Sequence, residues 1–587
     1  MIRATDDHAL APEMICLVRM PAVESFRFAT TSVTPPLGLA YVAAAIEASG
    51  RKVCVIDAVA EAPTATRAYL RGYLIGLAVE DVVARVPAEA KVVGISVIFT
   101  HEWPAAVRLI SLLRAARPDV TIILGGEHVS AMPEFCLSTA PADIAVMGEG
   151  EETIVHLLDA LDKGEDITAI PGTAARKGNR IVVNPRRPRR TDIDSIPWPA
   201  WHHFDLETYH RHRFVGGMDS DHVTVPILAT RGCPYQCTYC ASVRMWSPRW
   251  IPRDPITVVD EIEHYVRKFG ARNFPFQDLT AILKKDWIIA FCQEVERRGL
   301  EITWLLPTGT RLEAVDREVA VLLKRSGMVS MAFAPESGSD TTRRLVRKKM
   351  GADALYEAIG AAGSAGLNVA LFLVVGFPHE TPEHLAENYP FVDRLRETPV
   401  NDLSVTSYMA LPGTELFDNL YDSGKLAIDR GWFRHILDGN ALMPSRTYSP
   451  FVTPFDILRI KLGLYWRFYG RRRPGAPQKS LAVRIGEIVG GWGKRKHASR
   501  LQTAVMNGMR GALTTMLVTF GKRWMPRAEE ERMIAGWDAI FADIRRQKQA
   551  AGATEPAPAD SAELHRRNIV SLVRHEHEAA YEISLTR

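Results

Sequence analysis

The chain has 587 residues, 47% of them hydrophobic and 24% charged, and a net charge of +4 at pH 7. This length predicts two or three domains, and the composition is that of a soluble globular protein rather than a disordered or fibrous one. No uncharged apolar run reaches the ~18 residues that a membrane span needs, and residues 1–8 hold no apolar stretch, so neither a spanning helix nor export is expected. The seven cysteines are odd in number and follow no secretion signal, which argues against a disulfide framework and predicts a cytoplasmic protein.

Residues 14–160 alternate short apolar runs with longer amphipathic stretches. The short runs are rich in Val and Ile and end at turn residues, which predicts strands, and the stretches between them have helical spacing. Strands are predicted at 14–18, 53–57, 92–98, 120–124 and 144–147, and helices at 37–48 and 105–116. This alternation predicts an α/β domain over residues 1–165, a Rossmann-like, doubly wound parallel sheet whose ligand binds beyond the carboxyl ends of the strands.

Two turns at those strand ends have the character of a ligand site. Ser96 offers a hydroxyl near the end of the third strand, and Gly125-Gly126 follow the fourth strand, ahead of Glu127 and His128. Paired glycines let a bulky ligand approach the backbone closely. The same pair occurs in other flavodoxin-like domains, so the turns alone do not name the ligand.

Residues 166–215 are predicted to be a linker. The basic segment 184–190 contains two prolines. The segment 196–201 contains two more, Pro197 and Pro199, on either side of Trp198. Because prolines at this density exclude helix and disfavour strand, residues 172–200 are expected to lack regular structure.

Three cysteines follow a predicted strand at 223–229, with the spacing Cys233-x3-Cys237-x2-Cys240. Three thiolates this close together can hold three corners of a [4Fe–4S] cluster and leave the fourth iron open to a small molecule with an amine and a carboxylate, as in S-adenosylmethionine. A structural zinc site would need a fourth ligand, and the other cysteines stand singly in apolar or helical surroundings. A zinc knuckle and a disulfide are the alternatives to the cluster.

Residues 216–415 again alternate strand and helix. Further strands are predicted at 273–276, 302–306, 330–334 and 369–375, and a helix at 256–269. The pattern predicts a partial (β/α) barrel whose active site lies at the carboxyl ends of the strands. Polar or turn residues stand at those ends: Gln277, Asp278, Arg311, Glu336, Gly376 and Pro378. A zwitterionic ligand would need an acid for its ammonium and donors for its carboxylate, although each of these residues could instead cap a helix.

The C-terminal region is predicted to be mainly helical over 416–548, with a flexible tail at 549–587. Between residues 458 and 527 stand sixteen lysines and arginines against one acid, Glu487, so the rest of the chain is net acidic. A helix at 501–519 with basic flanks favours either a peripheral contact with an anionic membrane surface or a helical cap whose basic face is solvated. No nucleic-acid partner is expected, because no stacking platform or RNA-binding module is recognisable.

The segment Arg231-Gly232-Cys-x3-Cys-x-aromatic-Cys resembles the signature of the radical S-adenosylmethionine superfamily. The resemblance implies that Cys233, Cys237 and Cys240 bind the [4Fe–4S] cluster and that Tyr239 lies against the adenine. It further implies that the polar residues at the strand ends contact S-adenosylmethionine: Gln277, Asp278, Arg311 and Glu336 through its amine, carboxylate or ribose, and Gly376 and Pro378 at the adenine pocket.

The sheet domain ahead of the radical core resembles the cobalamin-binding domain of one large branch of that superfamily. This implies that cobalamin lies against Ser96, Gly125, Gly126, Glu127 and His128, with His128 lining the nucleotide loop or capping a helix rather than binding cobalt. The chain departs from the pattern Asp-x-His-x-x-Gly that follows the first strand in proteins with a histidine on cobalt, because Arg19 begins a segment there without histidine. Many cobalamin-dependent radical enzymes share this absence, so the resemblance implies cobalamin without a protein histidine on cobalt and leaves its lower axial ligand open.

The resemblance implies an enzyme with three cofactors, a [4Fe–4S] cluster, S-adenosylmethionine and cobalamin, and an external electron donor of flavodoxin or ferredoxin type. The leading hypothesis is methylation of an unactivated carbon in a secondary metabolite or lipid. The alternatives are an oxidative cyclisation or rearrangement of a tetrapyrrole or similar substrate, and a non-catalytic cobalamin sensor. We expect a cytoplasmic location, with the inner membrane surface as an alternative if the basic region binds lipid. The sequence does not name the substrate.

Overall fold

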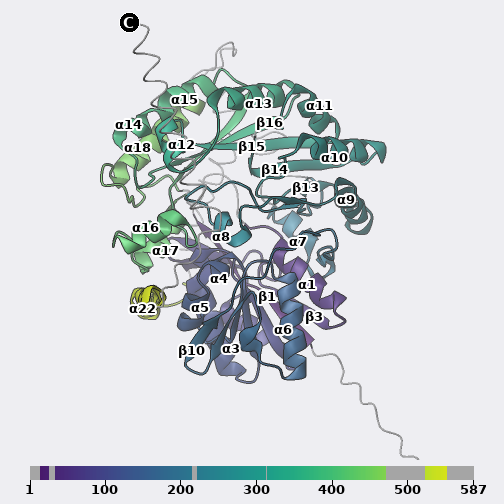
Figure 1. Ribbon diagram of the computed structural model, residues 1–587, viewed down its shortest axis with the longest axis vertical. Helices are drawn as coiled ribbons and strands as arrows, with labels where there is room; N and C mark the ends of the chain where they lie inside the picture. Colours follow the sequence, from purple (N-terminus) through teal and green to yellow (C-terminus); the bar gives the residue numbers. More distant parts are fainter. Residues whose placement is uncertain are drawn as a thin grey trace, which may run out of the picture. The chain divides into compact units, whose positions relative to one another are not determined.

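A computed structural model describes residues 14–25, 33–214, 221–311, 314–439, 441–470 and 523–550. The chain divides into two compact units, Met1–Ala535 and Gly536–Arg587. The described part of the second unit is helix α22 (Trp537–Ala550), and all other elements belong to the first (Figure 1). Among the helices in these residues, none combines the length and the apolar character needed to cross a bilayer.

The N-terminal sheet of the first unit has the strand order β10-β9-β8-β7-β6-β1-β3. The five adjacent strands from β8 to the edge strand β3 are parallel, as predicted. They are β1 (Met14–Arg19), β3 (Lys52–Asp57), β6 (Ala90–Ser96), β7 (Thr121–Gly125) and β8 (Ile144–Val146). Strands such as β6 are buried along almost their whole length, which explains why they are continuous apolar runs in the sequence.

Helices cover both faces of this sheet, so the doubly wound prediction is confirmed (Figure 1). Helices α1 (Leu37–Ala48) and α6 (Glu151–Lys163) pack against each other on one face, and α2 (Val79–Arg85) and α3 (Trp103–Ala116) pair on the other. The short helices α4 (Glu127–Ala131) and α5 (Pro133–Thr139) follow β7.

Two antiparallel strands extend the sheet within the predicted linker. These are β9 (Thr173–Lys177) and β10 (Arg180–Val183), joined by a hairpin at Gly178 and paired to β8. The expectation that 172–200 lacks regular structure therefore holds only after β10, because the prolines begin at Pro185. A small sheet, β2 (Ala22–Ser25), β5 (Gly72–Ile75) and β4 (Thr66–Tyr69), was also not predicted.

The second large sheet has five parallel strands in the order β13-β14-β15-β16-β17. They are β13 (Asn273–Pro275), β14 (Thr303–Thr310), β15 (Met328–Glu336), β16 (Asn368–Val375) and β17 (Val400–Ser407). The segment 223–229 runs parallel beside β13 through bridges at Thr224 and Ile227. This sheet is the predicted partial barrel, with β17 as an additional strand.

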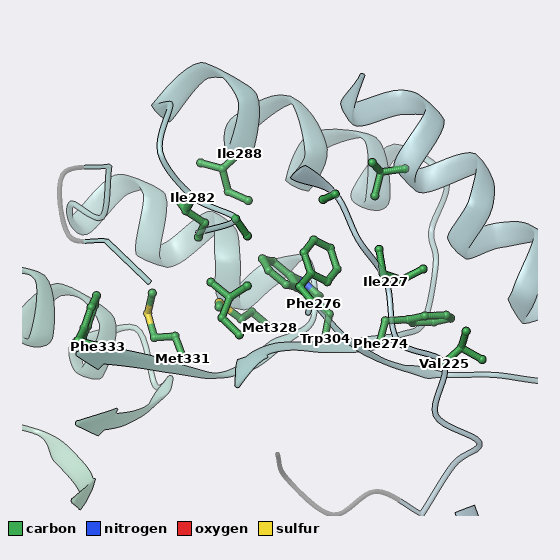
Figure 2. Close-up of a cluster of buried hydrophobic side chains, with 14 of the residues drawn as sticks. Val225, Ile227, Phe274, Phe276, Ile282, Ile288, Trp304, Met328, Met331 and Phe333 are labelled. Carbon is green, nitrogen blue, oxygen red and sulfur yellow. The ribbon is translucent and has the colours of Figure 1, made fainter. Parts of the chain in front are cut away.

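Helices cover the outer face of this sheet. They are α9 (Pro255–Phe269), α10 (Lys285–Arg297), α11 (Arg317–Arg325), α12 (Asp340–Leu345), α13 (Ala352–Ser364), α14 (Pro382–Ala386) and α15 (Asn388–Leu395). Figure 2 shows apolar side chains of the strands, among them Phe276, Trp304 and Met331, filling the layer beneath these helices. The carboxyl ends of the strands carry the polar residues of the candidate site.

The described part of the C-terminal region is helical, as predicted. It contains α16 (Glu415–Asp422), α17 (Arg430–Asp438), α18 (Pro454–Tyr465), a π-helical turn (Trp466–Gly470) and α21 (Arg527–Ile534). Most of the basic stretch, including the predicted helix at 501–519, and the tail beyond residue 550 lie outside the described residues. The contact with a membrane surface therefore stays a prediction.

Candidate active site

The three cysteines lie on a loop that begins where the segment 223–229 ends. The short strand β11 (Thr230–Arg231) pairs with β12 (Ile251–Pro252), and the loop then runs to helix α8 (Ser242–Trp246). All three thiols are free and half-buried. The Cys240 amide donates to the Cys237 carbonyl at 3.1 Å, which folds the loop back on itself. The loop thus presents three thiols at the carboxyl end of the barrel.

The surroundings of the thiols combine burial with positive charge. Burial raises the pKa of Cys233, of Cys237 and of Cys240, the last to about 11. Lys348 lowers the pKa of both Cys233 and Cys237, and Arg311 lowers that of Cys233. Since iron binds thiolates, the two cations oppose the cost of the negative charge that a cluster would bring to this loop.

The arrangement of the sulfurs fits an iron–sulfur cluster better than a single ion. A tetrahedral zinc ion holds its sulfur ligands about 4 Å apart. Within the described residues, one group of at least three possible metal ligands has all its ligand atoms within 4.8 Å of one another. It consists of Glu47, His202 and His203, and the three cysteines do not form such a group. At least two of the three sulfurs therefore lie more than 4.8 Å apart, which is too far for one tetrahedral ion and compatible with the cubane cluster that the spacing predicts.

Asp278, three residues after the end of β13, holds the start of the cysteine loop. Its carboxylate accepts hydrogen bonds from the Thr230 hydroxyl at 2.7 Å and from the amides of Thr230 and Ala229. It is 1% exposed, and burial raises its pKa to about 6. The backbone N–H of the neighbouring Gln277 donates to the Ile227 carbonyl at 2.9 Å. Both residues lie beneath the loop, where Asp278 positions the cysteines.

Glu336, at the end of β15, lies close to the thiols with Lys348. The Lys348 Nζ is 3.0 Å from the Glu336 carboxylate, and Glu336 raises the pKa of Tyr239, after burial itself, and that of Cys237. The Glu336 backbone has φ 66°, a strained value for a residue other than glycine. Lys348 was not predicted from the sequence, because the run Arg347-Lys348-Lys349 is indistinguishable there from a solvated surface.

Arg311 stacks on Tyr235, within the cysteine loop, with its guanidinium carbon 3.6 Å from the ring centroid. It also donates to the Lys349 carbonyl at 2.6 Å. The structure therefore brings Tyr239, Arg311 and Glu336 together around the thiols and adds Lys348 to them; their contacts with S-adenosylmethionine stay a prediction.

The turn at Gly376 closes another side of the site. Gly376 has φ 87°, and its amide and that of Phe377 donate to the Glu380 carboxylate at 2.6 and 3.0 Å. The Phe377 ring lies 5.5 Å from that of Tyr239 and 5.3 Å from that of Tyr408. The turn that contains Gly376 and Pro378 thus lies beside the cysteine loop, and Glu380, which is fully buried, fixes it.

The predicted cobalamin residues lie at the carboxyl ends of β6 and β7. Ser96 and Gly125 are register partners on these strands. Gly126 has φ 110°, and a Cβ there would lie 2.3 Å from the Val97 carbonyl oxygen, whereas a Cβ on Gly125 would meet nothing within 4 Å. The first glycine therefore leaves an open edge for a large planar ligand, and the second permits the turn.

Glu127 and His128 begin the helix after this turn. Burial raises the pKa of Glu127. His128 is 1% exposed, its Nδ1 lies 3.2 Å from the Thr100 hydroxyl, and its ring packs against Trp103. Burial lowers the His128 pKa to about 3, so the imidazole is neutral. These contacts place His128 inside the domain, and within the described residues its Nε2 is buried without a hydrogen-bond partner, so its role toward cobalamin stays a prediction.

Arg19 stands where a cobalt-binding histidine motif would begin. Its Nε donates to the Tyr209 hydroxyl at 2.7 Å and lies 3.5 Å from the Asp57 carboxylate. Tyr209, on helix α7 (Leu206–Arg211) of the linker, donates in turn to Asp57 at 2.8 Å. Arg19 is thus part of a closed buried network and offers no ligand to a metal.

The two strand edges face each other within the first unit. Arg231, two residues before Cys233, lies 3.1 Å from Glu149, in the turn after β8, and 2.5 Å from Glu151, the first residue of α6. Helix α8 packs on α4 (Figure 1). A Cβ on Gly413 would lie 3.2 Å from the Ala131 Cβ. The open edge of the sheet and the cysteine loop therefore belong to one site.

Comparisons with known proteins agree with both the predicted cobalamin-binding domain and the predicted radical core. The family model of the B12 binding domain matches residues 28–158, and that of the radical SAM superfamily matches residues 227–392. The chain therefore carries a B12 (cobalamin) binding domain followed by a radical S-adenosylmethionine domain, in the order that the motifs predicted.

Curated relatives are similar over different shares of their length. An uncharacterized methyltransferase of Pyrococcus horikoshii is 26% identical over 69% of this chain and 82% of its own. The cytidylyl-2-hydroxyethylphosphonate methyltransferase of Streptomyces wedmorensis is 27% identical over 71% of this chain and 84% of its own. The anaerobic magnesium-protoporphyrin IX monomethyl ester cyclase of Cereibacter sphaeroides is 30% identical over 52% of this chain and 49% of its own.

The fold is also that of a solved structure. The radical S-adenosylmethionine methyltransferase TsrM of Kitasatospora setae, with cobalamin and a [4Fe–4S] cluster bound, superposes with a TM-score of 0.59 at 15% identity, covering 86% of this chain and all of that one.

Proposed function

We propose that this protein is a cobalamin-dependent radical S-adenosylmethionine methyltransferase that methylates an unactivated carbon of a secondary metabolite or lipid. The observation that carries the proposal is the apposition of the cysteine loop and the open edge of the sheet, joined by Arg231 to Glu149 and Glu151. Two cofactors bound at these places would share one reaction space.

When bound, the cluster and S-adenosylmethionine supply a 5′-deoxyadenosyl radical, and cobalamin supplies the methyl group. Cys233, Cys237 and Cys240 would hold the cluster. Arg311 and Glu336, with Lys348 beside them, provide both signs of charge for the amino-acid part of S-adenosylmethionine. Tyr239 and Phe377 form the apolar wall that excludes water from the radical.

The residues at the sheet edge would position cobalamin. Ser96 and Gly125 lie side by side at the open edge, and the buried Glu127 and His128 support the turn from behind. No cobalt ligand is assigned to this chain, because Arg19 occupies the relevant place. We propose domain limits of 1–165, 216–415 and 416–548 around the linker, and an external donor of flavodoxin or ferredoxin type for the electron.

Oxidative cyclisation is the second candidate, because cyclases are among the relatives. The cyclase match spans about half of each chain, whereas the two methyltransferase matches span more than four fifths of those proteins. This difference in coverage favours methylation as the chemistry of the whole chain.

The two functions differ in the fate of the methyl group. Cells are grown with methyl-labelled methionine, and the metabolites of the wild type are compared with those of a Cys237→Ala strain. Methylation predicts a metabolite that carries one labelled methyl carbon and disappears in the variant. A metabolite that disappears without containing the label would contradict methylation and support cyclisation. Cys54→Ala is the control, since Cys54 lies on β3 of the other sheet.

A further inference from the structure

A cavity of about 330 Å³ lies behind the cysteine loop. Its walls come from the turn between β8 and α6, from the linker segment 186–190, and from the segment around α8. None of the residues assigned above to the cluster, S-adenosylmethionine or cobalamin lines it. The cavity therefore requires its own explanation.

The lining is strongly basic. Seven arginines contribute to it: Arg186, Arg187, Arg189, Arg190, Arg231, Arg244 and Arg249. Three acids, Glu149, Glu151 and Glu152, line the same space. Asp418, outside the cavity, pairs with Arg244 at 2.5 Å. Counting Asp418 with the three glutamates, the positive charges still exceed the negative ones by three, which favours an anionic occupant.

Two of the guanidinium groups contact several protein groups, and each still has one N–H without a partner. Arg189 donates to the carbonyls of Trp246 and Arg249 and lies 3.4 Å from Glu149. Arg187 contacts His156 and lies 3.6 Å from Glu152. Nevertheless, within the described part of the chain the Arg189 Nη2 and the Arg187 Nε are buried without a hydrogen-bond acceptor. Buried N–H groups of a cation without an acceptor are costly, and a bound oxyanion would satisfy them.

The other walls are apolar, because Met147, Ile196 and Met245 complete the lining. The volume is at the lower end of small-molecule sites, which run from about 300 to 1,000 Å³. Guanidinium groups match the geometry of phosphate oxygens in paired hydrogen bonds. We propose that this cavity binds a small organic phosphate, with the phosphate on the arginines and the organic group on the apolar wall.

Occupation of the site would reach the cysteine loop directly. A Cβ on Gly232 would lie 2.6 Å from the Arg189 Nη1 and 2.2 Å from the Arg249 carbonyl oxygen, so both arginines pack on the residue before Cys233. A ligand that fixes Arg189 would therefore stabilise the loop that carries the thiols. This site does not depend on which reaction the enzyme catalyses.

The test is calorimetric titration of the anaerobically reconstituted full-length protein with phenyl phosphate. Inorganic phosphate and benzoate serve as comparison probes. We expect phenyl phosphate to bind more tightly than either. Arg249→Met should weaken it by about fivefold, the equivalent of one hydrogen bond. Arg51→Met is the matched control, because Arg51 pairs with Asp159 and Asp162 away from the cavity and should leave the binding unchanged.

Arg189→Met should weaken the binding as well. If Arg189→Met fails to fold, Arg249→Met still tests the proposal, because the Arg249 side chain is exposed and its loss should not disturb folding. Absence of phenyl phosphate binding, or equal affinity in wild type and Arg249→Met, would overturn the proposal. Equal affinity for phenyl phosphate and inorganic phosphate would refute the organic group, and equal affinity for benzoate would refute the phosphate.

Discussion

Thr230 and Asp278 are joined by two hydrogen bonds, in which the Thr230 hydroxyl and amide both donate to one carboxylate oxygen, the hydroxyl at 2.7 Å. Thr230 stands three residues before Cys233. The carboxylate thus fixes the start of the cysteine loop from the neighbouring strand end.

Asp278→Asn should destabilise the protein and lower its iron content. The amide would turn an N–H donor toward one of the backbone N–H groups that the carboxylate now accepts, at a cost of about 2–3 kcal/mol. Urea unfolding and iron quantification after reconstitution measure the two effects. Thr230→Val removes the hydroxyl alone and should cost about 1 kcal/mol. Wild-type stability and iron content in Asp278→Asn would contradict this role.

Gly126→Ala and Gly125→Ala should separate folding from cofactor binding. A side chain on Gly126 would strain a backbone at φ 110° and meet the Val97 carbonyl, so this variant should lose about 1–3 kcal/mol of unfolding free energy. Gly125→Ala has open space and should unfold like the wild type without cofactor. If cobalamin lies on this edge, Gly125→Ala should nevertheless bind less of it, measured by absorbance of the reconstituted protein. Undiminished cobalamin content in Gly125→Ala would place the cofactor elsewhere.

Glu380→Gln should change the dependence of stability on pH. Burial raises the pKa of Glu380 to about 7, so the folded protein binds this proton more tightly than the unfolded chain. The resulting stabilisation is complete below about pH 4.5 and is lost as the pH rises through about 7. Relative to the variant, the wild type should therefore lose about 2 kcal/mol between about pH 5 and pH 8. Urea unfolding at both pH values measures this loss. A difference in unfolding free energy between wild type and variant that is the same at both pH values would contradict the prediction.

Tyr408→Phe tests whether the Tyr408 ring, which packs on Phe377, contacts substrate. The Tyr408 side chain is 4% exposed, and within the described residues its hydroxyl has no hydrogen-bond partner. Its removal should raise the free energy of unfolding by about 1 kcal/mol, while formation of the labelled product falls. Tyr265→Phe is the control, because that buried hydroxyl donates to Glu261 at 2.8 Å and its loss should destabilise the protein. Full product formation in Tyr408→Phe would assign Tyr408 to packing alone.

Much of the architecture follows from the sequence because buried parallel strands are continuous apolar runs. Strand β17 was missed, since only Val400, Leu403 and Val405 of its eight residues are apolar, and β9 and β10 were hidden by the prolines that follow them. The cysteines and the glycine turn could be found because their spacing is local.

The contacts that join distant segments could not be predicted. The ion pair of Glu336 with Lys348 exists only after β15 and the segment beyond α12 fold together, and no pattern in the sequence links the two residues. Asp278 was expected to bind S-adenosylmethionine, yet a sequence cannot show that its oxygens are occupied by the amides of its own loop.

The network of Arg19, Asp57 and Tyr209 has a practical consequence for dividing this protein. Tyr209 comes from the linker, but it supplies the hydroxyl that closes a buried charge pair inside the sheet domain. A fragment that ends at residue 165 would lack Tyr209. The ion pair of Arg19 and Asp57 would then be exposed to water on the side that Tyr209 covers. Anyone who expresses the cobalamin half separately, or grafts it onto another radical core, should carry the chain through residue 214.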